Sequence, residues 1–246
     1  MREITLVGIG CGNPDHMTLQ GIAALQGADL ILLPEKPEKP QLAQVREQIL
    51  ARHLGAQRPR IASFAMPRRE RGGDYLDAVD DWHRRIARAW TEAMAAFPDC
   101  RHVALLVWGD PALYDSTIRI ARRLDPEMAL RVVPGVSAVS VLAAAHGIPL
   151  NHVSSPVAIM PARQLTARGW PEGFESVVVM LDDGHALEGC KVSAHIFWGA
   201  YLGMPQEMLV HGPLAKRRGE ILALRKELRA RHGWIMDIYL LTTRTP

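Results

Sequence analysis

Three short glycine-centred loops form the pattern in this sequence that is best suited to chemistry. They occupy residues 8–14, 109–113 and 134–138, and each follows an apolar run. Glycine has no Cβ, so a ligand or another backbone can approach its main chain closely. In α/β folds, the loops at the carboxyl ends of strands form the ligand crevice. We therefore expect the three loops to lie together and to line one pocket for a small molecule.

The first loop partly matches a dinucleotide-binding fingerprint, because Gly8 and Gly10 follow a strand-like run. The third glycine of that fingerprint is replaced by Asn13, and the chain up to Thr18 delays the helix that would face a pyrophosphate. Glu35 lies about where a ribose-binding acid would stand. A nicotinamide cofactor is disfavoured but stays open as an alternative. A Walker loop is excluded, because no glycine-rich stretch ends in Gly-Lys-Ser or Gly-Lys-Thr.

The composition is that of a globular protein with no marked nucleic-acid or membrane character. Of the 246 residues, 48% are hydrophobic and 22% charged, and the formal net charge is +3. That charge predicts no nucleic-acid binding unless it is clustered. No apolar run approaches the roughly 18 residues of a membrane span, and Arg2 and Glu3 do not open a secretory signal. We expect a cytoplasmic protein.

The cysteines and histidines do not form a ligand pattern. Cys11, Cys100 and Cys190 are odd in number and show no CxxC spacing, which predicts reduced thiols. The ten histidines are scattered, so we expect no metal site. We interpret Cys11 as a small loop residue, because nothing nearby in sequence would lower its pKa.

Apolar periodicity predicts alternating strands and helices up to about residue 147, which favours an α/β fold with a mostly parallel sheet. Thr18 is expected to cap a helix, Pro34 to end a strand, and Gly55 to close the next helix. The expected strands are 3–9, 30–33, 60–64, 103–108 and 130–133. The expected helices are 19–25, 41–53, 74–97, 116–124 and 137–145.

Residues 148–155 have the composition of a domain junction, so we expect an N-terminal domain of residues 1–150 and a C-terminal domain of residues 151–246. The second half has fewer crossover helices, which predicts a mixed sheet. Its expected strands are 156–160, 176–181, 194–198 and 234–241, and its expected helices are 162–169 and 217–231.

The ordered motifs resemble those of the tetrapyrrole methylases. The resemblance rests on the first loop with its Pro14 and Thr18, on Gly-Asp-Pro at 109–111, and on Pro-Gly-Val-Ser-Ala at 134–138 before an alanine-rich helix. It covers nearly the whole chain. It implies two αβα domains, usually paired as a homodimer, with S-adenosyl-L-methionine in the cleft between the domains and S-adenosyl-L-homocysteine as product.

Two further segments, 108–117 and 233–241, are most similar to members that act in the aerobic cobalamin pathway. Those members methylate carbon 1 of precorrin-5 and release a two-carbon fragment as acetate, which gives precorrin-6A. The resemblance therefore implies a tetrapyrrole substrate and C-methyltransferase activity.

The resemblance also implies a set of cofactor-binding residues. Backbone groups at glycines, one carboxylate and small side chains suit a folded cofactor in a mostly apolar pocket. The implied contacts are Cys11, Gly109, Asp110, Leu113, Ser137, Ala138, Met180, Gly212 and Leu214.

Methyl transfer needs a well-placed acceptor carbon more than a nucleophilic side chain. Loss of the acetyl group needs water at a carbonyl, which a base can assist. Sirohaem-type relatives have an aspartate at the position of Pro34, and here the acid is displaced by one residue to Glu35. The candidates for catalysis are Glu35, Tyr114 and Asp115, beside a route that uses the substrate's own carboxylates. Asp110 is expected to orient its loop and the cofactor.

Arginine suits the acetate and propionate arms of a tetrapyrrole, because its guanidinium pairs with carboxylates in a bidentate way. The competing interpretation is a solvated helix face. The candidates are Arg68, Arg69, Arg71, Arg84, Arg85, Arg88 and Arg119.

Three other functions stay open beside the tetrapyrrole methyltransferase. They are a methyltransferase of the same fold that acts on RNA or on a protein, a nicotinamide-dependent oxidoreductase, and a sensor that binds the cofactor without turnover. The aromatic content of 6% is low for an RNA-stacking surface.

Overall fold

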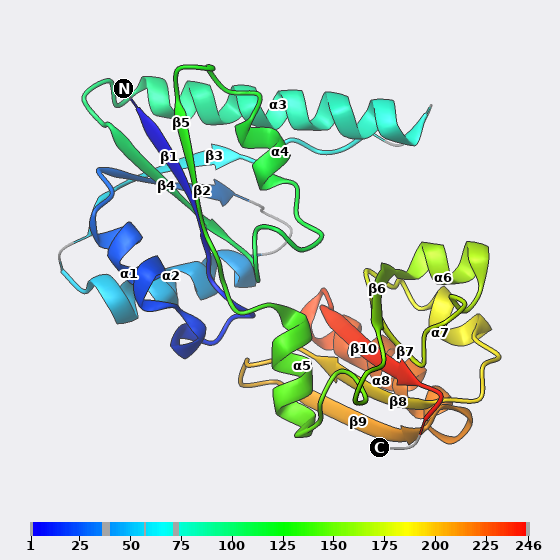
Figure 1. Cartoon of the computed structure of the whole chain (residues 1–246). Coiled ribbons are helices and arrows are strands. Elements are labelled where there is room, and N and C mark those ends of the chain that lie inside the picture. Colours follow the sequence, from blue (N-terminus) through cyan, green and yellow to red (C-terminus); the bar gives the residue numbers. More distant parts are fainter. Residues whose placement is uncertain (1, 36–39, 57, 71–73, 245–246) are drawn as a thin grey trace. The chain divides into compact units, whose positions relative to one another are not determined.

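The computed structural model describes residues 2–35, 40–56, 58–70 and 74–244. The chain divides into two compact units, Met1–Ser137 and Ala138–Pro246. Each unit contains a five-stranded sheet with helices packed against it (Figure 1). The predicted α/β class is therefore confirmed.

The sheet of the first unit is parallel throughout, as its strand–helix alternation predicts. Its strand order is β3-β2-β4-β1-β5, and every neighbouring pair is parallel. All five strands therefore end at the same edge, which is the edge that carries the glycine loops. The strands are β1 (Glu3–Gly8), β2 (Leu30–Glu35), β3 (Arg60–Ala65), β4 (His102–Val107) and β5 (Ala129–Val133).

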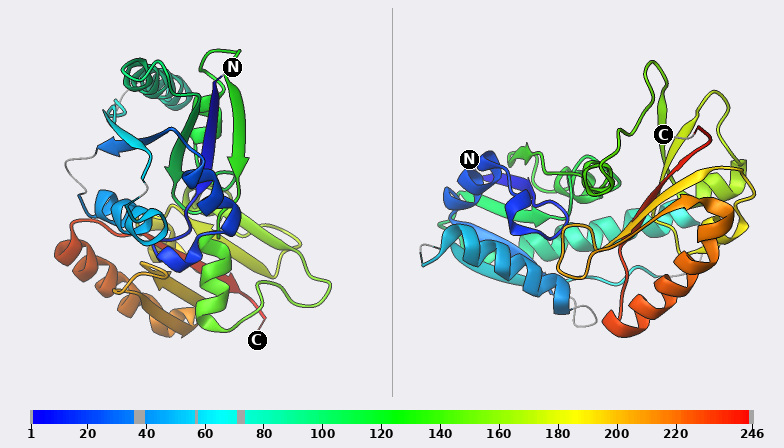
Figure 2. Two further views of the ribbon diagram at one scale, coloured as in Figure 1. Left: turned by 90° about the vertical axis from the view of Figure 1, so that its left-hand side faces the viewer. Right: turned by 90° about the horizontal axis from the view of Figure 1, so that it is seen from below.

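Helices cover both faces of this sheet. α1 and α2 pack together on one face, and α3 and α4 lie on the other (Figure 1 and Figure 2). Ile4 and Leu6 of β1 belong to the core that includes Trp90 of α3, so the intervening Thr5 faces α1 and α2. The helices are η1 (Pro14–His16), α1 (Leu19–Gln26), α2 (Pro40–Leu54), α3 (Tyr75–Ala95) and α4 (Thr117–Ala121).

Capping residues decide where these helices begin and end. The Thr18 hydroxyl accepts a hydrogen bond from the Gly21 N–H at 3.0 Å, which confirms Thr18 as the N-cap of α1. Asp74 caps α3 by accepting from the N–H groups of its first turn. Gly55 follows α2 with a φ of +53°, a left-handed conformation that glycine adopts without strain.

The prediction that Pro34 ends the second strand is wrong. β2 continues to Glu35, with Pro34 in register with Phe64 of β3. β2 pairs with β4 only at Leu30, Ile31 and Leu32, so one side of β2 has no ladder partner at Pro34. The missing N–H of proline costs no hydrogen bond there.

The sheet of the second unit is mixed, as predicted. Its order is β6-β7-β10-β8-β9, with β6 parallel to β7 and the other pairs antiparallel. α5 packs on β8 and β10, and α8 packs on β8 and β9. The strands are β6 (Val157–Pro161), β7 (Ser176–Met180), β8 (His195–Ala200), β9 (Met208–Pro213) and β10 (Asp237–Thr242). The helices are α5 (Ala138–His146), α6 (Ala162–Arg168), α7 (His185–Gly189) and α8 (Leu214–His232).

Three parts of the second unit differ from the prediction. β9 and α7 have no counterpart in the predicted elements, and residues 234–236 precede β10 instead of opening it. β9 is an edge strand whose Met208 and Leu209 are more than one-third exposed, so its apolar pattern is weak. α7 has five residues, which is too short for a helical period to appear.

The division between the units falls before α5, whereas the junction expected from composition lies near residue 150. α5 groups with the second unit because it packs on β8 and β10. A Cβ on Gly199 of β8 would lie 3.1 Å from Leu142 of α5, which shows how close the helix and sheet are.

Candidate functional site

The three glycine loops of the first unit meet backbone to backbone. An added Cβ on Gly135 would lie 2.2 Å from the Gly109 carbonyl oxygen and 2.7 Å from the Gly8 carbonyl carbon. Gly10 and Gly109 also form an isolated antiparallel bridge, in which the Gly109 N–H donates to the Gly10 oxygen at 2.8 Å. Any larger side chain at Gly8 or Gly135 would force these loops apart. The expectation that the loops lie together is confirmed.

The carboxylate of Asp110 joins the second loop to the third. One oxygen accepts from the Ala112 N–H at 2.8 Å, and the other accepts from the Gly135 N–H at 2.9 Å. Both carboxylate oxygens therefore bind the protein's own backbone. This geometry agrees with the interpretation of Asp110 as the residue that orients its loop.

Cys11 lies inside the same group of loops. Its side chain is buried, and its Sγ lies 4.0 Å from the Val136 carbonyl oxygen of the third loop. Burial raises the pKa of the Cys11 thiol to about 12. A thiol with so high a pKa is a poor nucleophile, which agrees with a role as a small loop residue.

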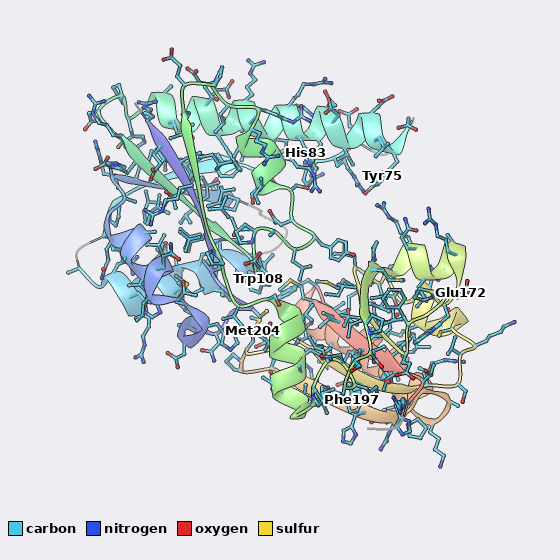
Figure 3. The ribbon with its side chains drawn as sticks, in the orientation of Figure 1. Tyr75, His83, Trp108, Glu172, Phe197 and Met204 are labelled. Carbon is cyan, nitrogen blue, oxygen red and sulfur yellow. The ribbon has the colours of Figure 1, made fainter. Side chains whose placement is uncertain are left out.

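Space remains beside the second loop. Gly109 has a φ of +66°, and a Cβ placed on it would meet nothing within 4 Å. Trp108 lies where β4 ends and this loop begins (Figure 3). A ligand can therefore approach the Cα of Gly109, whereas the N–H and C=O of Gly109 pair with Gly10 and the backbones of Gly8 and Gly135 contact each other.

The residues that follow the second loop are held tightly. Leu113 donates its N–H to the Asp110 carbonyl oxygen at 3.2 Å. Tyr114 has a φ of +50° and is 42% exposed, and partial burial raises the pKa of its hydroxyl. One oxygen of the Asp115 carboxylate accepts from the N–H of Thr117, the first residue of α4, at 2.6 Å and from its hydroxyl at 2.5 Å.

Glu35 is the last residue of β2 and its side chain is exposed. It lies at the edge of the parallel sheet where β1, β4 and β5 also end. The loop edge therefore carries Glu35, the loop residues Cys11, Gly109, Asp110 and Leu113, and Ser137, which ends the third loop.

The implied cofactor residues of the second unit do not share one place in its sheet. Met180 ends β7 in register with Ile238, whereas Gly212 of β9 is in register with Ile196. β10 and β8 lie between β7 and β9, and three strand spacings amount to about 14 Å. Leu214 is buried at the start of α8, and Ala138 starts α5.

The sheet edge that carries Met180 has a feature that the motifs do not reveal. Leu181 follows β7 with a φ of +58°, and Tyr201 follows β8 with a φ of +51°. Residues other than glycine adopt this conformation rarely, and such turns concentrate at functional sites. Ala200, which precedes Tyr201, pairs with Asp237 beside Met180's partner Ile238. Backbone strain of this kind has no sequence signal.

A buried polar network lies beneath the turn after β7. The Asp182 carboxylate accepts from Tyr239 Oη at 2.7 Å and from the Leu187 N–H at 3.0 Å. Arg225 donates to the Asp182 carbonyl oxygen at 2.7 Å and pairs with the Asp237 carboxylate. Burial raises the pKa of Asp237 to about 6, against the lowering effect of Arg225. Sequence reasoning missed this network because its members come from three separate stretches of the chain, at residues 182–187, 225 and 237–239.

Two of the arginine candidates on α3, Arg84 and Arg88, lie on a solvated helix face, and Arg85 is half-buried. Their partners are carboxylates one turn away, with distances of 2.9 Å for Arg84–Asp80, 2.9 Å for Arg85–Asp81 and 2.7 Å for Arg88–Glu92. Such pairs along a helix surface serve solvation and contribute little to stability.

The other arginine candidates have different surroundings. The guanidinium of Arg69 lies 5.2 Å from the centre of the Tyr75 ring, and Arg119 donates to the Asp115 carbonyl oxygen at 3.0 Å. Arg68 belongs to the described loop after β3, and Arg71 lies outside the described residues.

A cavity of about 310 Å³ lies away from the glycine loops. Glu3, Thr5, Ala23, His102 and Arg131 are among the residues that line it, between α1 and the beginnings of β1 and β4. It is therefore at the opposite edge of the first sheet and does not form part of the loop site.

Within the described ranges there is no group of three or more His, Cys, Asp or Glu side chains arranged to hold a metal ion. The three cysteines are free thiols. No helix in the described part of the chain is both long and apolar enough to cross a membrane.

Comparison with known proteins relates these features to a family. The family model of Tetrapyrrole (Corrin/Porphyrin) Methylases matches residues 3–217. The chain is 44% identical over 249 residues to the Precorrin-6A synthase [deacetylating] of Sinorhizobium sp, covering 98% of this chain and 95% of the relative.

Two solved structures place the fold. A putative cobalamin synthesis related protein (CobF) from Corynebacterium diphtheriae is 34% identical, with a TM-score of 0.82 and 99% coverage of both chains. The Uroporphyrin-III C-methyl transferase from Thermus thermophilus, solved in complex with S-adenyl homocysteine, is 20% identical with a TM-score of 0.60. It covers 98% of this chain and 97% of its own, and at this identity it shows the shared fold alone.

Proposed function

The chain belongs to the tetrapyrrole (corrin/porphyrin) methylases, and on that premise we propose that it converts precorrin-5 to precorrin-6A. In this proposal the protein is an S-adenosyl-L-methionine-dependent C-methyltransferase of cobalamin biosynthesis. It methylates carbon 1 of precorrin-5 and releases acetate. The observation that carries the proposal is the 44% identity, over nearly the full length of both chains, to a relative with that name.

The loop site fits the cofactor of this family. The space beside the Cα of Gly109 can admit a ligand, and the Asp110 carboxylate holds the second and third loops together through the Gly135 N–H. The bound cofactor supplies a methyl group on a sulfonium, which is electrophilic. In the proposal the first unit contributes Cys11, Gly109, Asp110, Leu113 and Ser137, and the second contributes Ala138, Met180, Gly212 and Leu214.

The protein's contribution to methyl transfer is positioning. An in-line displacement is accelerated when both reactants are held in one geometry, because the entropic cost of bringing them together is met on binding. The backbone contacts among Gly8, Gly109 and Gly135 and the hydrogen bonds of Asp110 make this part of the unit rigid. No nucleophilic side chain is needed, which agrees with the high pKa of Cys11.

Release of acetate requires water to add to the acetyl carbonyl carbon. The carbon–carbon bond to the macrocycle then breaks, its electron pair remains on the macrocycle, and a base takes the proton of the water. One oxygen of the Asp115 carboxylate already accepts two hydrogen bonds from Thr117, and Tyr114 has a raised pKa, which makes it a poor base near neutral pH. Glu35, exposed at the sheet edge that carries the loops, remains our leading candidate for the base.

The proposal includes the physiological setting that the family resemblance implies. The substrate is a tetrapyrrole with several carboxylates, the enzyme is cytoplasmic, and it acts as a homodimer without nucleic acid or membrane. Size-exclusion chromatography with light-scattering detection measures the molar mass in solution and distinguishes a dimer from a monomer of 27.2 kDa.

The test is incubation of the purified protein with precorrin-5 and methyl-labelled S-adenosyl-L-methionine, followed by mass spectrometry. We expect a tetrapyrrole carrying the label and an equimolar amount of free acetate. A parallel reaction with Glu35→Gln is expected to form less acetate, because an amide is not a base. Wild-type rates of acetate release in that variant would remove Glu35 from the mechanism.

The same experiment separates the other functions. Binding of the cofactor with no labelled tetrapyrrole would contradict the proposal and favour a sensor or a methyltransferase of macromolecules. Binding of NAD in place of S-adenosyl-L-homocysteine would favour an oxidoreductase.

A further inference from the structure

Arg46 of α2 has surroundings unlike those of the paired arginines described above. Its Nη1 donates to the Leu42 carbonyl oxygen at 3.0 Å, and its Nε lies 3.5 Å from the Leu106 carbonyl oxygen. A guanidinium has five N–H donors, and these two carbonyls engage two of them, the second at the limit of hydrogen-bond length. The side chain therefore has donor capacity that its protein contacts do not use.

Arg46 is a partly buried cation that forms no ion pair with any carboxylate of the described residues. Burial lowers the pKa of its guanidinium to about 10, and the negative charge of Asp115 acts in the opposite direction. Within the described residues no carboxylate lies within the 4.0 Å of an ion pair with Arg46, whereas Arg58, Arg60 and Arg225 each have one. A desolvated charge without a counter-ion is unfavourable unless an anion reaches it.

The guanidinium lies at the loop end of the first sheet. Leu106 is the second-last residue of β4, in register with Val7 of β1, and three residues later the chain reaches Gly109. The contact with Leu42 places the Arg46 head by the first turn of α2. The amino end of a helix carries partial positive charge, so it repels a cation and attracts an anion. Position and charge therefore both favour a negative group at this point.

Asp115 does not supply that group. One of its carboxylate oxygens accepts from Thr117, and its charge acts on Arg46 without an ion pair between the two side chains. It contributes a long-range attraction that helps keep Arg46 charged. A ligand carboxylate that reaches the guanidinium would form the ion pair that no carboxylate of the described residues forms with Arg46.

We propose that Arg46 binds a carboxylate of a ligand held at the glycine loops, an inference that rests on the proposed function. The binding chemistry is a charge-assisted, bidentate contact between guanidinium and carboxylate. Two ligands of the proposed reaction carry such a group: the tetrapyrrole, on its peripheral arms, and the cofactor, on its amino-acid tail. The measurement below distinguishes them.

The test compares Arg46→Met and Arg46→Lys with Arg52→Met as the matched control. Arg52 is on the same helix but is 66% exposed and pairs weakly with Asp15 at 3.7 Å. Three probes are titrated by calorimetry: S-adenosyl-L-homocysteine, 5′-methylthioadenosine, which lacks the amino-acid tail, and uroporphyrin III, a stable tetrapyrrole polycarboxylate. Loss of a charge-assisted contact is expected to lower the affinity for the probe that makes this contact about 10- to 100-fold.

If the partner is the cofactor's carboxylate, Arg46→Met weakens S-adenosyl-L-homocysteine but not 5′-methylthioadenosine. If it is the tetrapyrrole, uroporphyrin III binding weakens and the KM for precorrin-5 rises, while both nucleoside probes bind as in the wild type. Arg46→Lys keeps the positive charge but not the bidentate guanidinium geometry, so its affinity for the affected probe is expected to lie between those of the wild type and Arg46→Met. Arg52→Met is expected to match the wild type.

Unchanged affinity for all three probes in Arg46→Met, with or without a lower kcat, would overturn the inference and leave Arg46 as a structural residue. Near-ultraviolet circular dichroism verifies that each variant is folded. If Arg46→Met does not fold, the same titrations are carried out with Arg46→Lys. Failure of the wild-type protein to bind S-adenosyl-L-homocysteine would instead count against the proposed function.

Discussion

The two units stabilise the turns at their strand ends in opposite ways. In the first, three loops are held by backbone contact at Gly8, Gly109 and Gly135, with one carboxylate, Asp110, behind them. In the second, the turn after β7 is held by buried side chains that converge on Asp182. The first arrangement packs the loops with glycine in place of larger side chains and leaves space beside the Cα of Gly109. The second arrangement holds the left-handed backbone at Leu181 through the buried hydrogen bonds and ion pair of Asp182, Tyr239 and Arg225.

Two arginines show the same contrast. Arg225 of α8 is 6% exposed, and its charge is met by Asp237, which also accepts from Trp198 Nε1 at 2.7 Å. Arg46 of α2 has carbonyl contacts but no carboxylate within the described residues. A charge that is fully paired inside the protein is structural. A desolvated charge that is left unpaired indicates a place for a ligand.

The largest effect is expected from breaking the pair in the second unit. Arg225→Met leaves the Asp237 carboxylate, 4% exposed, without its cation. Loss of one partner of a buried pair costs about 3–5 kcal/mol of the free energy of unfolding. The measurement is urea denaturation at pH 8. Arg231→Met, on the same helix but 63% exposed, is the control and is expected to change little.

The pH dependence of that variant sharpens the prediction. The folded-state pKa of Asp237 is raised to about 6, above its unfolded value, so its contribution to stability is greatest below about pH 4 and is lost as pH rises towards 6. Removing Arg225 raises this pKa further and extends the loss to higher pH. The destabilisation is therefore expected to be smaller at pH 5 than at pH 8. An equal destabilisation at both pH values would contradict a charge-based role for the network.

An intermediate effect is expected from separating the loops of the first unit. The Cβ of Gly135→Ala would lie 2.2 Å from the Gly109 oxygen, so the backbone must shift. We expect a loss of about 1–3 kcal/mol in the free energy of unfolding and weaker binding of S-adenosyl-L-homocysteine. Thermal unfolding and calorimetric titration measure both.

The control for this prediction is Gly219→Ala in α8, where a Cβ would meet nothing within 4 Å. An alanine there is expected to stabilise the helix by about 0.5–1 kcal/mol. Wild-type stability and affinity in Gly135→Ala would show that the loops do not depend on their close contact.

The smallest effect is expected from Asp110→Asn. The amide keeps one oxygen acceptor and turns an NH₂ group towards the second backbone N–H, so one hydrogen bond is lost at a cost of about 1–2 kcal/mol. Affinity for S-adenosyl-L-homocysteine, measured by calorimetry, is expected to fall less than in Gly135→Ala. Asp125→Asn, in an exposed turn where the carboxylate accepts from the Glu127 N–H, is the matched control. A larger effect than that of Gly135→Ala would show that the carboxylate, not the glycine contact, holds the loops.

Much of the fold of the first unit follows from local patterns. Thr18 caps α1 as predicted, Gly55 follows α2 in a left-handed conformation, and the strand–helix alternation yields a fully parallel sheet. Pro34 shows the limit of such rules. Whether a proline ends a strand depends on whether a neighbour needs its N–H, and the register of β4 with β2 decides that.

The second unit was harder to predict for the same reason. β9 is a half-exposed edge strand and α7 has five residues, so neither has a clear period. Asp182, Arg225 and Asp237 are far apart in the chain, and nothing in their local sequences indicates that they meet. Met180 and Gly212, which the motif resemblance groups together, lie in different registers of the sheet.

The sequence by itself determined the family, the order of most strands and helices, and the three glycine loops, because each depends on short-range constraints such as capping and the absence of a Cβ. The tertiary structure alone decided that Gly8, Gly109 and Gly135 touch, that Asp110 reaches Gly135, and that Arg46 lies by Leu106 with no ion pair to a carboxylate of the described residues. These contacts join residues that are distant in the chain. They exist because parallel strands in register bring separate loop ends to one edge.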